Sequence, residues 1–191
     1  MTKTPFLYRT AKTRRLLILL GAGALLSACT TNLEDTLKCP GITVLDDTRT
    51  MTRMASSRSA NAAFVATVLG AAGTCEYDLD DQTKTGEVEA EIAVTFDIAR
   101  STALKSNVVA FDYYVAVTNP YGKVLNKVTF PVQATLPVGK NRLTVKDDPL
   151  TLTIPLKTST KVAGAYKKYH IVVGLQLSPS ELDYNQKRKS P

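Results

Sequence analysis

Alternation of apolar and polar positions is the strongest pattern in the chain. Between residues 87 and 98, every second position is apolar: Val88, Ala90, Ile92, Val94, Phe96 and Ile98. The positions between them begin with Glu87, Glu89 and Glu91. A period of two buries one face of a β-strand and leaves the other face in solvent. The same alternation returns at residues 109–117 and 166–177, so these segments also predict strands.

Shorter apolar runs predict further strands, and the residues between them predict turns. The runs cover residues 41–45, 62–69, 123–136, 142–145 and 150–156. The sequence Gly-Ala-Ala-Gly at 70–73 predicts a turn, and Asn-Pro-Tyr-Gly at 119–122 predicts the turn of a hairpin. Residues 48–61 have no apolar period and predict a loop.

The helical period of 3.6 residues is missing from every long segment, and one short helix is expected at the end of the chain. Ser178 precedes Pro179 and Glu181, which places a serine at the N-cap, a proline in the first helical position and a glutamate in the third. The whole pattern predicts an all-β fold with a short C-terminal helix. The strands form either an antiparallel β-sandwich of immunoglobulin-like type or a small barrel.

The N-terminal segment has the three parts of a secretory signal. A basic stretch ending in Arg14-Arg15 precedes 11 apolar residues, 16–26, and the small residues Ser27 and Ala28 follow. A transmembrane helix needs about 20 apolar residues, so the apolar block favours a cleaved signal over an uncleaved anchor.

The end of this signal, Leu26-Ser27-Ala28-Cys29, resembles the bacterial lipobox, at which signal peptidase II cuts before the cysteine. The resemblance implies a diacylglyceryl group on the Cys29 thiol and a third acyl chain, such as palmitate, on its amine. Two or three chains anchor a protein stably, because each buried methylene contributes about 0.8 kcal/mol. The residue after the cysteine is Thr30 rather than the Asp that resembles an inner-membrane retention signal in enteric bacteria, and this favours the outer membrane. Cleavage after Ala28 by an ordinary signal peptidase, leaving a free thiol, is the alternative.

The predicted organisation is a lipoprotein signal peptide at 1–28, a lipidated tether at 29–38 and a β-sandwich domain at 39–191. Once Cys29 is acylated, Cys39 and Cys75 are the remaining cysteines, in a compartment that permits disulfides. A bridge between them would close a loop of about 37 residues and stabilise the fold by about 3 to 4 kcal/mol. Two free thiols are the alternative.

Composition excludes several function classes. The net charge is +7, but the first 28 residues hold five bases and no acid, which leaves +2 for the rest of the chain. A nearly neutral body argues against a nucleic-acid partner. Three cysteines and one histidine cannot supply a zinc site of four cysteines or of two cysteines and two histidines, and there is no Trp for base stacking.

Candidate catalytic and metal-binding residues are few, and each has a simpler structural explanation. His170 is the only histidine, no G-x-S-x-G turn is present, and Glu87, Glu89 and Glu91 alternate on a solvated strand face. A calcium site would need two acidic loops to meet, and its residues would be Asp46, Asp47, Asp78, Asp80 and Asp81. The sequence therefore predicts no catalytic residue, metal or cofactor. The basic tail at 187–189 is expected in solvent or, alternatively, on anionic lipid.

An ordered set of short motifs covers most of the mature chain. In order, they are Cys39-Pro40-Gly41-Ile42 with Val44-Leu45-Asp46, Cys75-Glu76-Tyr77-Asp78, Tyr114-Val115-Ala116-Val117 leading to Pro120 and Gly122, Ile154-Pro155-Leu156, and Val173-Gly174-Leu175-Gln176-Leu177 through Leu182, Tyr184 and Asn185. Together they resemble a family of small alphaproteobacterial envelope lipoproteins. The family has no assigned activity, so the resemblance implies an envelope location and no catalytic residue. Residues 48–61 depart from the family.

These inferences predict a non-enzymatic outer-membrane lipoprotein that faces the periplasm. Its domain would bind or support another envelope component, most simply an envelope protein. Tyr121 and Tyr184 are the candidate contact residues, on a surface that joins residues 119–122 to residues 181–185. Either tyrosine can instead serve packing. A periplasmic carrier of a small ligand, a weak enzyme and a surface-exposed adhesin-like module are the alternatives.

Overall fold

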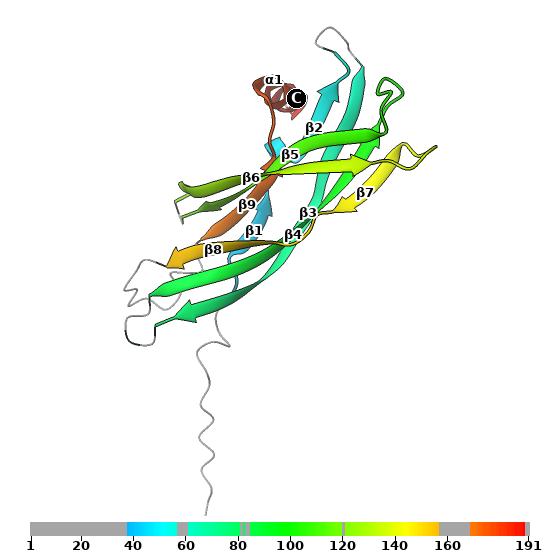
Figure 1. Ribbon diagram of the computed structural model, residues 1–191. Helices are drawn as coiled ribbons and strands as arrows, with labels where there is room; N and C mark the ends of the chain where they lie inside the picture. The colour runs from blue at the N-terminus through cyan, green and yellow to red at the C-terminus, as the bar shows by residue number, and fades with distance from the viewer. Residues whose placement is uncertain are drawn as a thin grey trace, which may run out of the picture. The chain divides into compact units, whose positions relative to one another are not determined.

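The structure is a computed structural model that describes residues 38–56, 61–80, 82, 85–119, 121–156 and 169–189. Strands dominate these ranges, and a single α-helix lies at the C-terminal end of them (Figure 1). The elements are β1 (Gly41–Val44), the 3-10 turn η2 (Asp46–Thr48), β2 (Thr50–Met54), β3 (Ala62–Leu79), β4 (Gly86–Arg100), β5 (Val108–Thr118), β6 (Val124–Thr135), β7 (Arg142–Lys146), β8 (Leu150–Leu156), β9 (His170–Leu175) and α1 (Pro179–Lys189). The predicted all-β fold with a short C-terminal helix is confirmed.

The strands form two sheets. Sheet A has the order β1-β9-β5-β6, and sheet B has the order β2-β3-β4-β7. β8 pairs with the first half of β4, and β7 pairs with its second half. All pairings are antiparallel except that of β1 with β9, which is parallel. β2, β3 and β4 neighbour one another in chain order, whereas the sheets of constant-type immunoglobulin domains have the orders A-B-E-D and C-F-G. The strand order of the two sheets therefore differs from that of a constant-type immunoglobulin domain.

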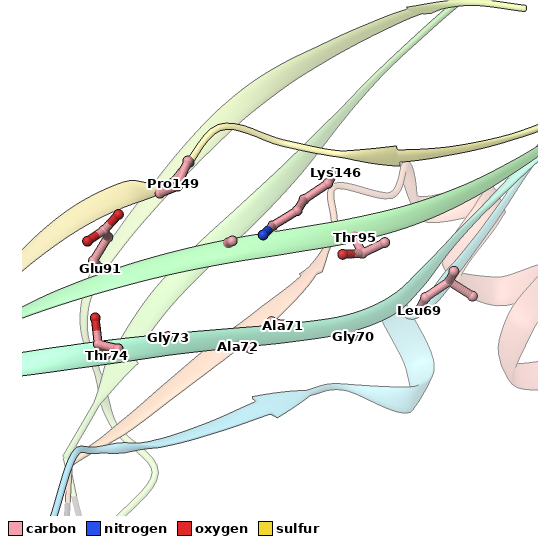
Figure 2. Close-up of a pocket in the computed structure, with 11 residues that line it drawn as sticks. Leu69, Gly70, Ala71, Ala72, Gly73, Thr74, Glu91, Thr95, Lys146 and Pro149 are labelled. Carbon is pink, nitrogen blue, oxygen red and sulfur yellow. The ribbon is translucent and has the colours of Figure 1, made fainter.

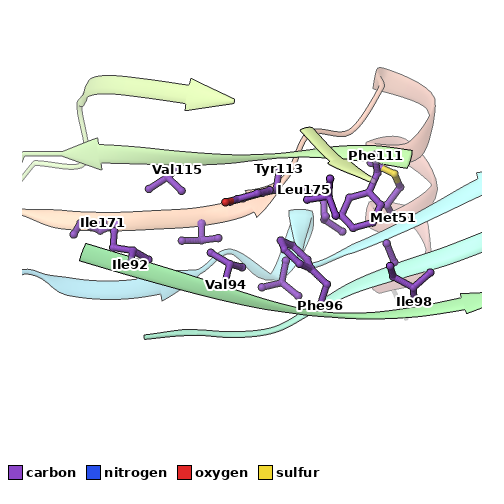
Figure 3. Packing of buried hydrophobic residues seen from close by; sticks show 14 of the residues in the cluster. Met51, Ile92, Val94, Phe96, Ile98, Phe111, Tyr113, Val115, Ile171 and Leu175 are labelled. Carbon is purple, nitrogen blue, oxygen red and sulfur yellow. The ribbon is translucent and has the colours of Figure 1, made fainter. Parts of the chain in front are cut away.

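The core lies between the two sheets and is built by the alternation seen in the sequence. Val94, Phe96 and Ile98 of β4 point toward Phe111 and Tyr113 of β5 (Figure 3). The ring of Phe96 lies 5.3 Å from that of Phe111 and 5.1 Å from that of Tyr113, centroid to centroid. Edge-on and tilted aromatic pairs of this kind stabilise a core beyond the area they bury.

One polar contact crosses this aromatic core. The hydroxyl of Tyr113, whose side chain is fully buried, donates a 2.6 Å hydrogen bond to the carboxylate of Asp147, just after β7. Burial raises the pKa of Tyr113 far above its ordinary value, and the hydrogen bond and negative charge of Asp147 raise it further. The phenol therefore keeps its proton at neutral pH, and its hydrogen bond links sheet A to the segment between β7 and β8.

Two expectations for the N-terminal half were wrong. Residues 50–54 form β2 within the predicted loop at 48–61, because Met51 reaches the core as β2 pairs with β3. The predicted turn at Gly70–Gly73 is instead part of the continuous strand β3, with a bulge between Val68 and Gly70. A Cβ atom on Gly73 would lie 2.2 Å from the carbonyl oxygen of Glu91, so this glycine permits close approach of β3 and β4.

The predicted disulfide is confirmed. Cys39, just before β1, is bonded to Cys75 of β3, and their Cα atoms are 5.6 Å apart. Tyr77 adds a second tie, because its hydroxyl donates a 2.9 Å hydrogen bond to the carbonyl of Lys38. The bridge therefore fixes the first described residues of the chain to the far half of β3.

The predicted capping of the C-terminal helix is also confirmed. The backbone N–H of Ser178 donates to Glu181 at 2.8 Å, and the N–H of Glu181 donates to the Ser178 hydroxyl at 3.3 Å. The side-chain amide of Asn185 donates to the carbonyls of Asp47 and Thr50, at 3.0 and 2.7 Å. These contacts dock α1 on η2 and β2.

Candidate functional site

The outer face of sheet A contains a hollow of about 550 Å³, here called the sheet A hollow. It spans all four strands of the sheet and is bordered by the turn between β5 and β6. Its lining residues are Thr43, Leu45, Tyr114, Ala116, Thr118, Asn119, Gly122, Val124, Lys127, His170 and Val172. Aliphatic and aromatic atoms make up most of this surface, with a few hydroxyl, amide and basic groups between them. Ligand-binding sites commonly have this combination.

The floor of the hollow is more buried than strand alternation predicts. Tyr114 and Ala116 alternate with the core residues of β5, so the pattern predicts that they face solvent, yet they are only 8% and 3% exposed. The ammonium group of Lys127 lies 4.3 Å from the centre of the Tyr114 ring and donates to Gln176 at 2.9 Å. The Tyr114 hydroxyl forms a 3.0 Å hydrogen bond with the Thr48 hydroxyl. Neighbouring side chains therefore cover and fix this part of the outer face.

The rim is a tightly hydrogen-bonded turn. The side-chain oxygen of Asn119 accepts hydrogen bonds from the backbone N–H groups of Tyr121 and Lys123, at 3.0 and 2.9 Å. Gly122 has a φ of 78°, a left-handed conformation that favours glycine. The turn holds Tyr121 outward with 92% of its surface exposed, and Val124 beside it is 53% exposed. The hairpin predicted from residues 119–122 is thus confirmed, and its tip carries apolar side chains in solvent.

The electrostatics of the hollow are basic. Lys127 and His170 are its two basic lining residues, and no described lining residue is acidic. His170 is the first residue of β9 and is exposed, with its ring against Gly41 of the neighbouring strand. An occupant with an acidic group and an apolar part would match this surface.

The two tyrosines predicted to share a surface are far apart. Thr118, next to the Tyr121 turn, pairs with His170 at the start of β9, whereas Tyr184 lies on α1, beyond Leu175 at the end of β9. The five residue steps from His170 to Leu175 span about 17 Å. Tyr121 adjoins the sheet A hollow, while Tyr184 lines a separate hollow of about 820 Å³ with Arg53 and Glu181. The sequence predicted one surface that contains both tyrosines, whereas the structure places them on two separate surfaces.

In the hollow beside α1, the charged groups already have partners. Arg53 pairs with Glu181 at 2.8 Å. Burial would raise the pKa of Glu181, but hydrogen bonds from Ser178 and Arg53, with the charge of Arg53, outweigh it and lower that pKa below its ordinary value. This hollow is therefore bounded by the contacts that hold the helix.

A third hollow, of about 840 Å³, lies on the outer face of sheet B. Its floor is the run of small residues from Gly70 to Gly73, and Lys146 extends over β4 between Glu91 and Thr95 (Figure 2). Small side chains explain its shape, because the strand surface there has little to fill it. It is a wide, shallow depression.

The acidic residues weighed for calcium do not converge. Asp46 and Asp47 lie in η2, whose neighbour Arg49 contacts β3 at Val68, whereas Asp78 is near the end of β3. Ten residue steps of strand, about 33 Å, separate Val68 from Asp78. Asp80 follows Asp78, and Asp81 is outside the described residues. No group of three or more His, Cys, Asp or Glu side chains that could hold a metal ion occurs in the described ranges.

The other predicted residues lie where the strand pattern places them or outside the described ranges. Glu87, Glu89 and Glu91 are exposed on β4. Cys29, the signal peptide and most of the tether lie outside the described residues. Of the basic tail, Lys187 pairs with Asp183 on α1 at 2.7 Å. None of the helices in the described part of the chain is both long and apolar enough to cross a membrane.

Comparison of the chain with protein-family models, with curated proteins and with solved structures finds no match. The sequence signals missed the floor of the sheet A hollow, because Tyr114, Lys127 and His170 come together only through the order β9-β5-β6. The feature that sequence analysis did identify is the turn that forms its rim.

Proposed function

We propose that this protein is a lipid-anchored outer-membrane lipoprotein whose domain faces the periplasm and binds another envelope component. The observation that carries the binding role is the sheet A hollow with its apolar rim. The anchor rests on Cys29 in its lipobox-like context, and the Cys39–Cys75 bridge fits an oxidising compartment. The proposal assigns recognition and no catalytic residue.

The distribution of exposed apolar side chains supports binding at this location. Four of the nine large apolar side chains exposed among the described residues lie in the lining of the hollow or in the hairpin tip beside it: Leu45, Tyr121, Val124 and Leu125. Single exposed apolar residues are common on proteins, but their concentration around a concave surface is typical of an interaction site. With Lys127 and His170 in the lining, the expected partner presents an acidic group next to an apolar surface.

Site-specific photo-crosslinking in intact cells tests the binding role. A crosslinking amino acid at position 124 should capture a component, whereas the same amino acid at position 69 on sheet B should not. Val124 and Leu69 are both 53% exposed, so exposure alone predicts equal capture. Lys127→Glu should reduce the yield at position 124, and mass analysis of the product should show an acidic group. Equal capture at both positions, or a yield unchanged by Lys127→Glu, would contradict the proposal.

The anchor is tested separately. Labelled palmitate should be incorporated by the wild-type chain and not by Cys29→Ser, and the wild-type chain should fractionate with membranes. Incorporation by Cys29→Ser, or a fully soluble wild-type protein, would contradict the lipoprotein assignment.

A further inference from the structure

One end of sheet A collects segments that are distant in the sequence. Gly41 of β1 pairs with His170 of β9, and His170 pairs with Thr118 of β5, so these residues form one row across the sheet. β1 and β9 run away from this row, whereas β5 runs toward it. The residues before Gly41 and the turn after Thr118 therefore leave the sheet at the same end, which is called the tether end below.

The tether end presents the apolar and basic side chains of a hairpin tip. Tyr121, Val124 and Leu125 are 92%, 53% and 51% exposed. Lys123 in the same turn is exposed, as is Lys38, where the described chain begins. Tyrosine has an amphipathic ring suited to the boundary between water and lipid, and lysine can keep its charge at the headgroups while its stem lies on apolar surface.

The length of the tether brings this tip within reach of a bilayer. Nine residues, Thr30 to Lys38, separate the anchoring cysteine from Cys39. A segment of nine residues reaches at most about 32 Å even when it is fully extended. Three strand spacings, about 14 Å, separate β1 from β6 across sheet A. A tip so close to the anchor meets the membrane at high local concentration, so even a weak contact is populated.

Charge distinguishes this tip from the β3–β4 hairpin. The β3–β4 hairpin is also close to the tether, because Cys75 is bonded to Cys39. Residues 76–89, which surround its turn, contain six acids and one lysine, whereas residues 119–127 contain two lysines and no acid. An anionic lipid surface repels the first segment and attracts the second. Of these two loops, the β5–β6 tip is the one that combines a favourable charge with exposed apolar side chains.

We propose that the tip of the β5–β6 hairpin, residues 121–125, is a second membrane contact of the anchored protein. Its partner is the anionic surface of the bilayer in which the acyl chains of Cys29 lie. Tyr121 and Leu125 enter the interfacial region, Lys123 and Lys38 face the lipid phosphates, and Val124 lines the sheet A hollow. This contact orients the domain so that the sheet A hollow opens beside the membrane. The inference rests on the lipid anchor of the proposed function.

The absence of tryptophan from the chain allows a direct test. Tyr121→Trp and Val138→Trp each introduce one fluorophore at positions that are 92% and 90% exposed. Val138 is the matched control, because it follows β6 at the end opposite Val124, about 37 Å along the strand. Both full-length acylated proteins are reconstituted into vesicles of phosphatidylethanolamine and phosphatidylglycerol, with and without brominated acyl chains. Acylation is measured by mass on the same samples.

The tryptophan of the Tyr121→Trp chain should emit at shorter wavelength in these vesicles than in detergent-free solution and be quenched by brominated lipid. The tryptophan of the Val138→Trp chain should show neither effect. Lys123→Glu, added to the Tyr121→Trp chain, should reduce the quenching.

Two results would overturn the second contact and leave the anchor standing. The first is water-like, unquenched emission from a fully acylated Tyr121→Trp sample, and the second is equal quenching in the two tryptophan variants. A chain without acyl groups would overturn the proposed anchor and this inference together.

Discussion

Removing the hydroxyl of Tyr113 tests how the two halves of the fold are joined. Tyr113→Phe keeps the ring contacts with Phe96 and Phe130, at 5.1 and 5.4 Å, and deletes the 2.6 Å hydrogen bond to Asp147. A hydrogen bond to a charged group contributes about 1.5 to 3 kcal/mol to the free energy of unfolding. For a domain of this size that loss lowers the melting temperature by about 4 to 9 °C.

Tyr114→Phe is the matched control, because its hydroxyl bonds to the neutral hydroxyl of Thr48 at 3.0 Å. Tyr114→Phe should lower the free energy of unfolding by a smaller amount, about 1 kcal/mol. Urea unfolding of the purified, disulfide-intact proteins at neutral pH gives both values. Equal costs for the two variants would contradict the assignment of a charge-assisted bond to Tyr113.

The raised pKa of Tyr113 adds a pH dependence with a definite sign. The folded protein keeps this proton at a pH where the unfolded chain loses it. The contribution of Tyr113 to the free energy of unfolding is therefore fully present below about pH 10 and decreases as the pH rises further. The slope from one such group is about 1.4 kcal/mol per pH unit. The stability difference between wild type and Tyr113→Phe should therefore shrink between about pH 10 and pH 11. A constant difference over that interval would refute the reasoning.

Three further changes test other parts of the fold. Reducing the Cys39–Cys75 bridge, which spans 36 positions, should lower the free energy of unfolding by about 3 to 4 kcal/mol in urea titrations, and no change would contradict its structural role. Gly73→Ala should cost about 1 to 3 kcal/mol because its Cβ meets the Glu91 carbonyl, whereas Gly70→Ala, with nothing within 4 Å, should be neutral or slightly stabilising in the same assay. Because the pKa of Glu181 is lowered in the folded protein, its carboxylate stabilises the fold above the unfolded pKa of about 4.3, and this stabilisation is lost as the pH falls. The melting temperatures of wild type and Glu181→Gln should therefore converge at low pH.

The strands with one buried face were predictable, because alternation alone records them. In β4, every apolar position of the pattern from Val88 to Ile98 is buried. β2 was missed because only five residues pair with β3, too few to establish a period, and Met51 is its main core contact. The Gly70–Gly73 segment was mistaken for a turn because glycine usually interrupts strands, whereas Gly73 lies in β3 where its neighbour β4 comes too close for a side chain.

The parallel pairing of β1 with β9 could not be predicted from local pattern. It joins residues near position 41 to residues near position 170, and neither strand carries a signal for the other. Yet this pairing determines the candidate site, because it places His170 between β1 and β5 and puts the β5–β6 turn at the tether end. Local sequence predicted the turn, and only the strand order predicts what lies beside it.

The same strand order gives the two candidate tyrosines different surroundings. Tyr121 is next to the sheet A hollow at the tether end, and Tyr184 is on α1, at the other end of β9. Tyr184 also stacks with Arg188, with the guanidinium 5.6 Å from its ring, on a helix already held by Arg53 and Asn185. The contacts of Tyr184 are therefore those of a docked helix, whereas Tyr121 projects into solvent beside a basic, partly apolar concave surface. Of the two residues, Tyr121 is the one whose exposure calls for a binding partner.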